Sequence, residues 1–222
     1  MLRGTGSLKA AVLLAALAPV GFYAAIETPA VGQVEKKAPA PAAAAPASVI
    51  GTLDRALLEA MKSGQRLGYA GRYKRLSPVL DRVFNFPRIA QLTLGSNWGR
   101  LDPGQQKQFV TALRNYTIAT YAGRFDAYAG ERFAITGSRS LQPGTVGVFT
   151  TFTEKNGKIH RFDYLLQKQG NVWQVINVVA DGVSDLSLKR AEYTDTLEKK
   201  GFGALLAHLQ KQMDAYASGR KK

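Results

Sequence analysis

The most constraining feature of this sequence is a change in its hydrophobic period near residue 130. From Glu131 onward, large apolar residues recur at every second position, which is typical of strands that bury one face. Asn156-Gly157 and Gly170-Asn171 interrupt the alternation, and such dipeptides favour tight turns between antiparallel strands. The pattern predicts an antiparallel meander of about four strands, over residues 131–138, 145–154, 158–169 and 172–180.

On both sides of these strands the hydrophobic period is helical. An apolar stripe runs from Ile50 to Met61, while Asn85 and Asp102 are suited to cap the helices that follow them. The helix after Asp102 is predicted to reach about Tyr128, and two further helices cover residues 185–199 and 202–217. Helices, then a sheet, then helices predict an α+β fold, with helices packed on a curved, mostly antiparallel sheet as in NTF2-like proteins.

The N-terminus has the pattern of an export signal. Arg3 and Lys9 precede an apolar run over residues 10–26, and small residues follow it. The run is short for a spanning helix, which needs about 20 apolar residues. We expect a signal peptide or N-terminal anchor over residues 1–30, a Pro/Ala-rich linker over 31–47, and one folded domain over 48–222.

Charge and composition narrow the classes of function. The chain has 30 Lys and Arg against 16 Asp and Glu, and a net charge of +14 favours an anionic partner. Export removes the chain from the cytoplasm, so we expect no nucleic acid among its partners. The lack of cysteine and the presence of only two histidines argue against metal sites, and we expect no cofactor. The common hydrolase, phosphate-loop and metalloprotease motifs are absent from the sequence, which argues against an enzyme.

Three stretches of the sequence resemble a known family. They are Val83-Phe84-Asn85-Phe86-Pro87-Arg88-Ile89-Ala90 through Trp98, Gln106 through Phe125, and Trp173-Gln174-Val175 through Phe202. In this order and spacing the chain resembles the MlaC/Ttg2D (toluene-tolerance) family of periplasmic lipid-binding proteins. It is most similar to the hopanoid-associated branch called HpnM. Asp185 and Lys189 depart from the pattern, where the family has an apolar and an aromatic residue.

The resemblance implies a periplasmic carrier without enzymatic activity. Its domain, over residues 48–222, would enclose phospholipid or hopanoid tails in a hydrophobic pocket. It would shuttle them between inner- and outer-membrane transport complexes, as the substrate-binding component of an ABC transporter does.

Period and strand parity predict which side chains would line such a pocket. The long helix and the inner face of the meander would form its two walls, with two residues near its mouth. The predicted lining residues are Trp98, Phe109, Leu113, Tyr116 and Phe125 on the helical side, Val148, Phe152, Phe162, Tyr164, Leu166, Val175 and Val179 on the sheet side, and Val183 and Leu186 near the mouth.

Other interpretations of these residues remain open. The aromatic residues could form only a packed core. The chain could also be an adaptor of a lipid-synthesis machinery, with its groove used for protein contact, or an NTF2-like enzyme. Arg190 matches the family pattern, and it could contact a lipid headgroup or form an ion pair with Asp181 or Glu192. His160 and Asp163 have opposite strand parity, so we expect them to point to opposite faces.

Export is the first testable expectation. The basic start, the apolar run and the Pro/Ala-rich segment predict that the chain leaves the cytoplasm. Cell fractionation should therefore recover it with periplasmic or membrane markers. Recovery with cytoplasmic markers would contradict the expectation.

Overall fold

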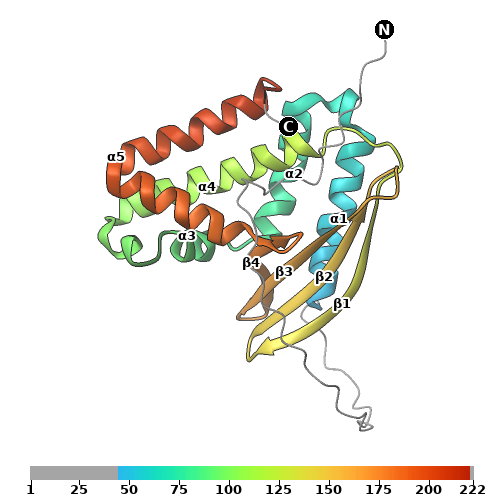
Figure 1. Ribbon diagram of the computed structural model, residues 1–222, viewed down its shortest axis with the longest axis horizontal. Coiled ribbons are helices and arrows are strands. Elements are labelled where there is room, and N and C mark those ends of the chain that lie inside the picture. Colours follow the sequence, from blue (N-terminus) through green and yellow to red (C-terminus); the bar gives the residue numbers. More distant parts are fainter. Residues whose placement is uncertain (1–44, 221–222) are drawn as a thin grey trace.

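The computed structural model describes residues 45–220, so the predicted signal or anchor and nearly all of the linker lie outside the described residues. The chain first forms helices and then the sheet, and it ends in one long, broken helix (Figure 1). The elements are α1 (Pro46–Lys62), α2 (Gly64–Val83), α3 (Phe86–Leu94), the 3₁₀ segment η1 (Gly95–Arg100), α4 (Pro103–Arg124), β1 (Arg132–Gln142), β2 (Thr145–Thr153), β3 (Ile159–Gln169), β4 (Val172–Ala180), β5 (Val183–Ser184) and α5 (Asp185–Ala217).

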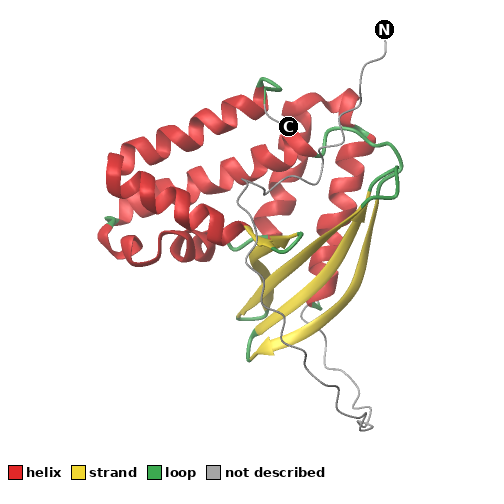
Figure 2. Ribbon diagram, in the orientation of Figure 1, coloured by secondary structure: helices red, strands yellow, loops and turns green. Residues whose placement is uncertain are grey.

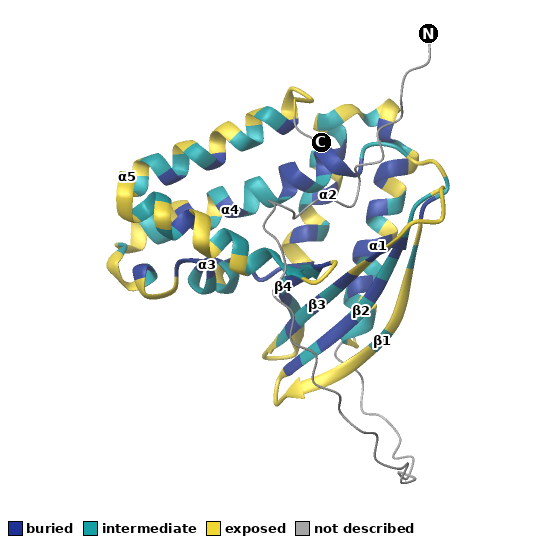
Figure 3. Cartoon of the chain, viewed as in Figure 1, coloured by how far each residue is buried: buried dark blue, intermediate teal, exposed yellow. Residues whose placement is uncertain are grey.

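The strands form an open antiparallel meander in the order β1-β2-β3-β4-β5, which confirms the predicted class of fold (Figure 2). The fifth strand was not predicted, because its two residues are too few to show a period. β1 also runs four residues beyond its predicted end and carries two register shifts against β2. β1 is an edge strand and is largely exposed, whereas β2 and β3 alternate between buried and partly exposed residues (Figure 3).

Helices cover one face of the sheet and continue beyond it as a separate bundle. α1 lies along the sheet and packs against β1, β2 and β4 (Figure 1). α2 packs between α1 and α4, and it also contacts β4. α3, α4 and α5 pack on one another, and α3 and α5 also contact β4. α4 therefore lies in both parts of the molecule.

The helix caps follow the sequence closely. The Asn85 side chain accepts a hydrogen bond from the backbone N–H of Arg88 at 3.0 Å, which caps α3. Asp102 and Gln105 form a reciprocal capping box at the start of α4. Gly201 breaks α5 with a φ of +81°, a conformation that glycine adopts at little cost. The two predicted C-terminal helices are the two halves of this element.

α4 ends at Arg124, four residues before the predicted end near Tyr128. The guanidinium of Arg72 donates to the carbonyl of Ala122 at 2.8 Å and to that of Gly64 at 2.7 Å. In a longer helix, the Ala122 carbonyl would instead accept from residue 126. Arg72 is buried, so this contact with α2 caps α4 from outside its own sequence. Local periodicity could not indicate it.

The packing of α4 on the end of α5 gives a test of the bundle. A Cβ added to Gly123 would lie 2.5 Å from a ring carbon of Tyr216. We expect Gly123→Ala to lower the free energy of unfolding by about 1–3 kcal/mol through overpacking, although alanine favours helices. Gly203→Ala, in the same bundle, meets nothing within 4 Å and should be neutral or slightly stabilising. Chemical denaturation of both variants measures the difference, and equal effects would contradict this packing.

Candidate functional site

The largest apolar region lies between the inner face of the sheet and the helices that cover it. We call it the sheet cluster. Residues from α1, α2, α4 and strands β2 to β4 contribute to it. Its buried members are Ile50, Leu53, Leu57, Ala60, Met61, Leu76, Leu80, Val83, Phe84, Phe86, Ile118, Ala122, Phe125, Val148, Phe152, Phe162, Tyr164, Leu166, Val175, Val178 and Ala180.

Half of the predicted lining residues belong to the sheet cluster. They alternate along three neighbouring strands, and the end of α4 adds one more, so parity placed them correctly on one face. These residues are Phe125, Val148, Phe152, Phe162, Tyr164, Leu166 and Val175. Sequence reasoning did not assign α1 and α2 to this wall. The apolar stripe of α1, from Ile50 to Met61, was a signal that could have done so.

The other predicted helical residues lie in a second cluster, which we call the helical cluster. Its buried members are Ala90, Leu94, Phe109, Leu113, Tyr193, Leu205 and Leu209, and Trp98 and Tyr116 pack against it. α4 has 22 residues and is therefore about 33 Å long. Phe109, Leu113 and Tyr116 face the helical cluster, whereas Ile118 and Ala122 further along the helix, and Phe125 just after it, belong to the sheet cluster. The four residues predicted from η1 and from α4 up to Tyr116 are thus separate from those on the strands.

A bulge in β4 changes the face of one predicted residue. Leu166 pairs with Val175 but Leu165 pairs with Asn177, so Ile176 is an extra residue in the strand. Beyond the bulge Val178 and Ala180 join the sheet cluster. Val179 pairs with Asp163 on the opposite face, contrary to simple alternation.

The two residues predicted near the mouth, Val183 in β5 and Leu186 at the start of α5, are partly buried and belong to neither cluster.

Aromatic rings connect the helices to the sheet within the sheet cluster. Phe84 lies 5.9 Å from Tyr121, which stacks on Phe125 at 5.7 Å between ring centroids. Phe125 contacts Phe152 edge to face at 6.1 Å, and Phe152 lies 4.8 Å from Phe133. Pairs at these separations favour one another beyond their buried area. The rings form one apolar path from the end of α2 to β1.

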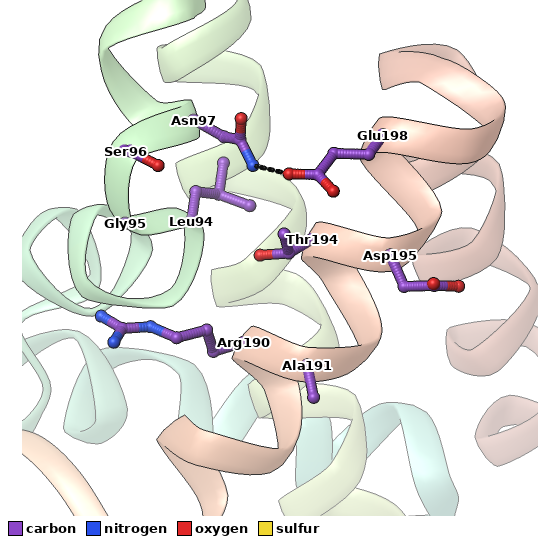
Figure 4. Close-up of a pocket in the computed structure, with 9 residues that line it drawn as sticks. All are labelled: Leu94, Gly95, Ser96, Asn97, Arg190, Ala191, Thr194, Asp195 and Glu198. Atoms are coloured by element: carbon purple, nitrogen blue, oxygen red, sulfur yellow. Dashed lines mark hydrogen bonds between the residues drawn. The ribbon is translucent and has the colours of Figure 1, made fainter.

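Arg190 contacts backbone rather than a carboxylate. Its guanidinium donates to the carbonyl of Leu92, at 2.9 Å from Nε, in the last turn of α3. Asp181 and Glu192, the two ion-pair partners considered from sequence, instead contact His160 and His208. Arg190 borders a hollow of about 460 Å³ between η1 and the first half of α5 (Figure 4). Glu198 accepts a hydrogen bond from Asn97 at 3.0 Å across this hollow (Figure 4).

His160 joins three parts of the sheet. It points away from Asp163, as strand parity predicted, and its ring nitrogens lie 2.7 Å from Asp181 and 3.0 Å from Glu154. Asp181 also accepts from the backbone N–H of Arg161 at 2.8 Å. Although burial raises the pKa of Asp181, the hydrogen bonds from His160 and Arg161 hold it below its ordinary value. The arrangement is suited to fixing the ends of β3 and β4.

Within residues 45–220, no group of three or more His, Asp or Glu side chains is placed to hold a metal ion. None of the helices in this part of the chain has the length and apolar character needed to cross a membrane.

The family model described as "MlaC protein" matches residues 52–211, which is most of the chain and nearly all of the described fold. The chain belongs to the MlaC family. This confirms the broader resemblance drawn from the three sequence stretches, while the hopanoid-associated branch remains a prediction.

Two similar proteins can be set beside this MlaC family member. It is 23% identical over 146 residues to toluene tolerance protein Ttg2D of Pseudomonas putida. That match spans 65% of this chain and 66% of the relative. A solved structure, the phospholipid-binding protein of Ralstonia solanacearum in complex with a phospholipid, matches with a TM-score of 0.65. It is 24% identical and covers 77% of this chain and 97% of the other, which shows a shared fold.

One charged residue of this MlaC family member lies inside the apolar region and was missed from sequence. Asp54 of α1 is 7% exposed, and its Oδ1 has no hydrogen-bond partner. It lies at the i+4 position from Ile50 and the i−3 position from Leu57, so it shares the buried face of the helix. Burial raises the pKa of Asp54 to about 7, while Arg55 acts in the opposite direction. A carboxyl on an apolar helical stripe is the signal that could have found it.

The raised pKa of Asp54 predicts a pH dependence of stability. The folded state holds this proton more tightly than the unfolded state, where the pKa is about 3.9. The protonated Asp54 therefore contributes its full stabilisation of the folded state below pH 4, and this stabilisation is lost as the pH rises through about 7. As the pH rises from 5 to 8, the free energy of unfolding of Asp54→Asn should increase relative to that of the parent by on the order of 1–3 kcal/mol. Denaturant titrations at both pH values measure this difference, and a pH-independent effect would contradict the shift.

Proposed function

We propose that this MlaC family member is a periplasmic lipid carrier that binds phospholipid or hopanoid tails between its sheet and helices. The observation that carries the proposal is the sheet cluster, an apolar layer that extends over three long strands and is covered by three helices. The Ralstonia protein with the same fold is in complex with a phospholipid, which supports lipid as the ligand of this fold.

The dimensions of the sheet suit a lipid tail. Strands of 9–11 residues extend over about 30–36 Å at a rise of about 3.3 Å per residue. One leaflet of a bilayer has about 15 Å of hydrocarbon, half of the usual core thickness. A tail could therefore lie along the inner face of the sheet with its full length out of water.

The energetics suit a carrier without a chemical step. Burying each CH₂ group contributes about 0.8 kcal/mol, whether the group enters a bilayer or an apolar protein site. Transfer between membrane and protein can then be nearly balanced, as reversible loading and release require. The apolar character of the lining is enough for this role, and the proposal assigns no catalytic residue.

Shuttling between inner- and outer-membrane complexes is the finer part of the proposal. The net charge of +14 would attract the protein to anionic headgroups and to acidic docking surfaces. Such attraction increases association rates and weakens with salt, because the Debye length is only about 8 Å at physiological ionic strength.

Tryptophan substitutions on the two faces of the sheet test the proposed site. Val148 is completely buried in the sheet cluster, whereas Val179 faces the other side. An indole at position 148 would fill room that a lipid tail needs. We expect Val148→Trp to fold but to carry several-fold less co-purifying lipid, and Val179→Trp to carry as much as the parent. Native mass spectrometry and lipid extraction measure the load, and thermal melts report folding.

Two results would contradict the proposal. If the parent protein purified from cells carries no lipid, the sheet cluster is only a packed core and an adaptor role gains support. If Val148→Trp keeps the full lipid load, lipid binds elsewhere. In a core without lipid, Val148→Trp should only overpack, at a cost of about 1–3 kcal/mol or more.

A further inference from the structure

Buried polar side chains around the sheet cluster satisfy their hydrogen bonds almost completely. The hydroxyl of Thr150 donates to the carbonyl of Phe162 at 3.1 Å, and that of Thr120 to the carbonyl of Tyr116 at 2.9 Å. The guanidinium of Arg72 donates to two carbonyls. Among residues 45–220, the buried side-chain atoms without a partner are Asp54 Oδ1 and the hydroxyl of Tyr193. Asp54 is the one that lies against the proposed lipid site.

The environment of Asp54 offers it little compensation. It shares a helical face with Ile50, Leu57 and Met61, all of which belong to the sheet cluster. The neighbouring Arg55 is exposed and donates instead to the hydroxyl of Thr52 at 3.2 Å. A buried acceptor without a partner is costly, so a group of this kind calls for a specific explanation.

Two tyrosines of the lipid site lie within the electrostatic reach of Asp54. Burial raises the pKa of Tyr121 and of Tyr164, and the negative charge of Asp54 adds to both shifts. Tyr164 in β3 is part of the sheet cluster and Tyr121 in α4 packs against it, as does the buried face of α1 that carries Asp54. A ligand between the sheet and these helices would meet Asp54 along its apolar body.

We propose that the Oδ1 atom of Asp54 accepts a hydrogen bond from a hydroxyl group on the apolar body of the bound lipid. The inference rests on the proposed lipid-carrier function and names the class of lipid. A phosphodiester headgroup has no donor to offer at neutral pH, and its negative charge would be repelled by a carboxylate. An ammonium would bring a second charge into an apolar cluster, which is costly. A neutral hydroxyl satisfies the acceptor and leaves the remaining contacts apolar.

The experiment compares lipids that differ only in the hydroxyl. The pairs are 12-hydroxystearate against stearate, and diplopterol against hopane, which is the same pentacyclic skeleton without the hydroxyl. Binding is measured on the full exported protein after removal of its lipid. Sites built to bond a hydroxyl reject analogues that lack it, so we expect the parent to favour a hydroxylated member by about tenfold or more.

Three variants locate the preference. Asp54→Leu should bind the unhydroxylated member as well as the parent does, or better, and should lose the preference. Asp54→Asn keeps a carbonyl acceptor and should retain part of the preference for the hydroxylated lipid. This variant tests the same contact if the leucine variant folds poorly. Asp163→Leu is the matched control, because Asp163 is a partly buried aspartate on the outer face of β3. It should keep the full preference.

The outcomes separate the two proposals. If the parent binds both members of each pair equally, or if Asp54→Leu keeps the preference, the role of Asp54 is refuted and lipid carriage stands. If the parent binds none of these lipids and no phospholipid either, the carrier function itself fails. Loss of the preference in Asp163→Leu as well would show that it does not arise at Asp54.

Discussion

The apolar inner face of an open sheet is the constraint on which the structure depends. A meander with free edges cannot bury this face by closing on itself, so other elements must cover it. α1 and α2 precede the sheet in sequence and, together with the second half of α4, provide the cover. The arrangement creates an apolar layer between unlike walls, one of strands and one of helices. In the proposed function, a lipid tail occupies the same layer.

A few polar contacts hold the covering helices in place. At the junction between α2 and α3, the backbone N–H of Asn85 donates to the carbonyl of Val175 at 3.0 Å. This hydrogen bond fixes the junction against β4. Arg72 ties α2 to the end of α4 and to the start of its own helix. His160 and Asp181 fix the far end of the strands. These hydrogen bonds lie around the apolar layer. Within the layer, apolar side chains pack together with Asp54, whose Oδ1 has no hydrogen-bond partner among the described residues.

Local patterns predicted those elements whose cause is local. The turns at Asn156-Gly157 and Gly170-Asn171, the caps at Asn85 and Asp102, and the break at Gly201 all depend on the conformational preferences of residues at the site itself. The faces of β2 and β3 followed from alternation for the same reason, because each strand is regular along its length. Alternation placed five of the fourteen predicted lining residues, Val148, Phe152, Phe162, Tyr164 and Leu166, on the face that the sheet cluster occupies.

What the sequence by itself determined is the meander, the capped helices and membership of the family, since each depends on short-range pattern or on the order of motifs. Only the tertiary structure decided which helices cover the sheet. It also decided where α4 stops, because Arg72 reaches it from another helix, and which way Val179 points, because a bulge against β3 shifts the strand. The burial of Asp54 is likewise a tertiary fact. Desolvation of a carboxyl costs free energy only when segments distant in the sequence enclose it. No local pattern in the sequence indicates which segments will do so.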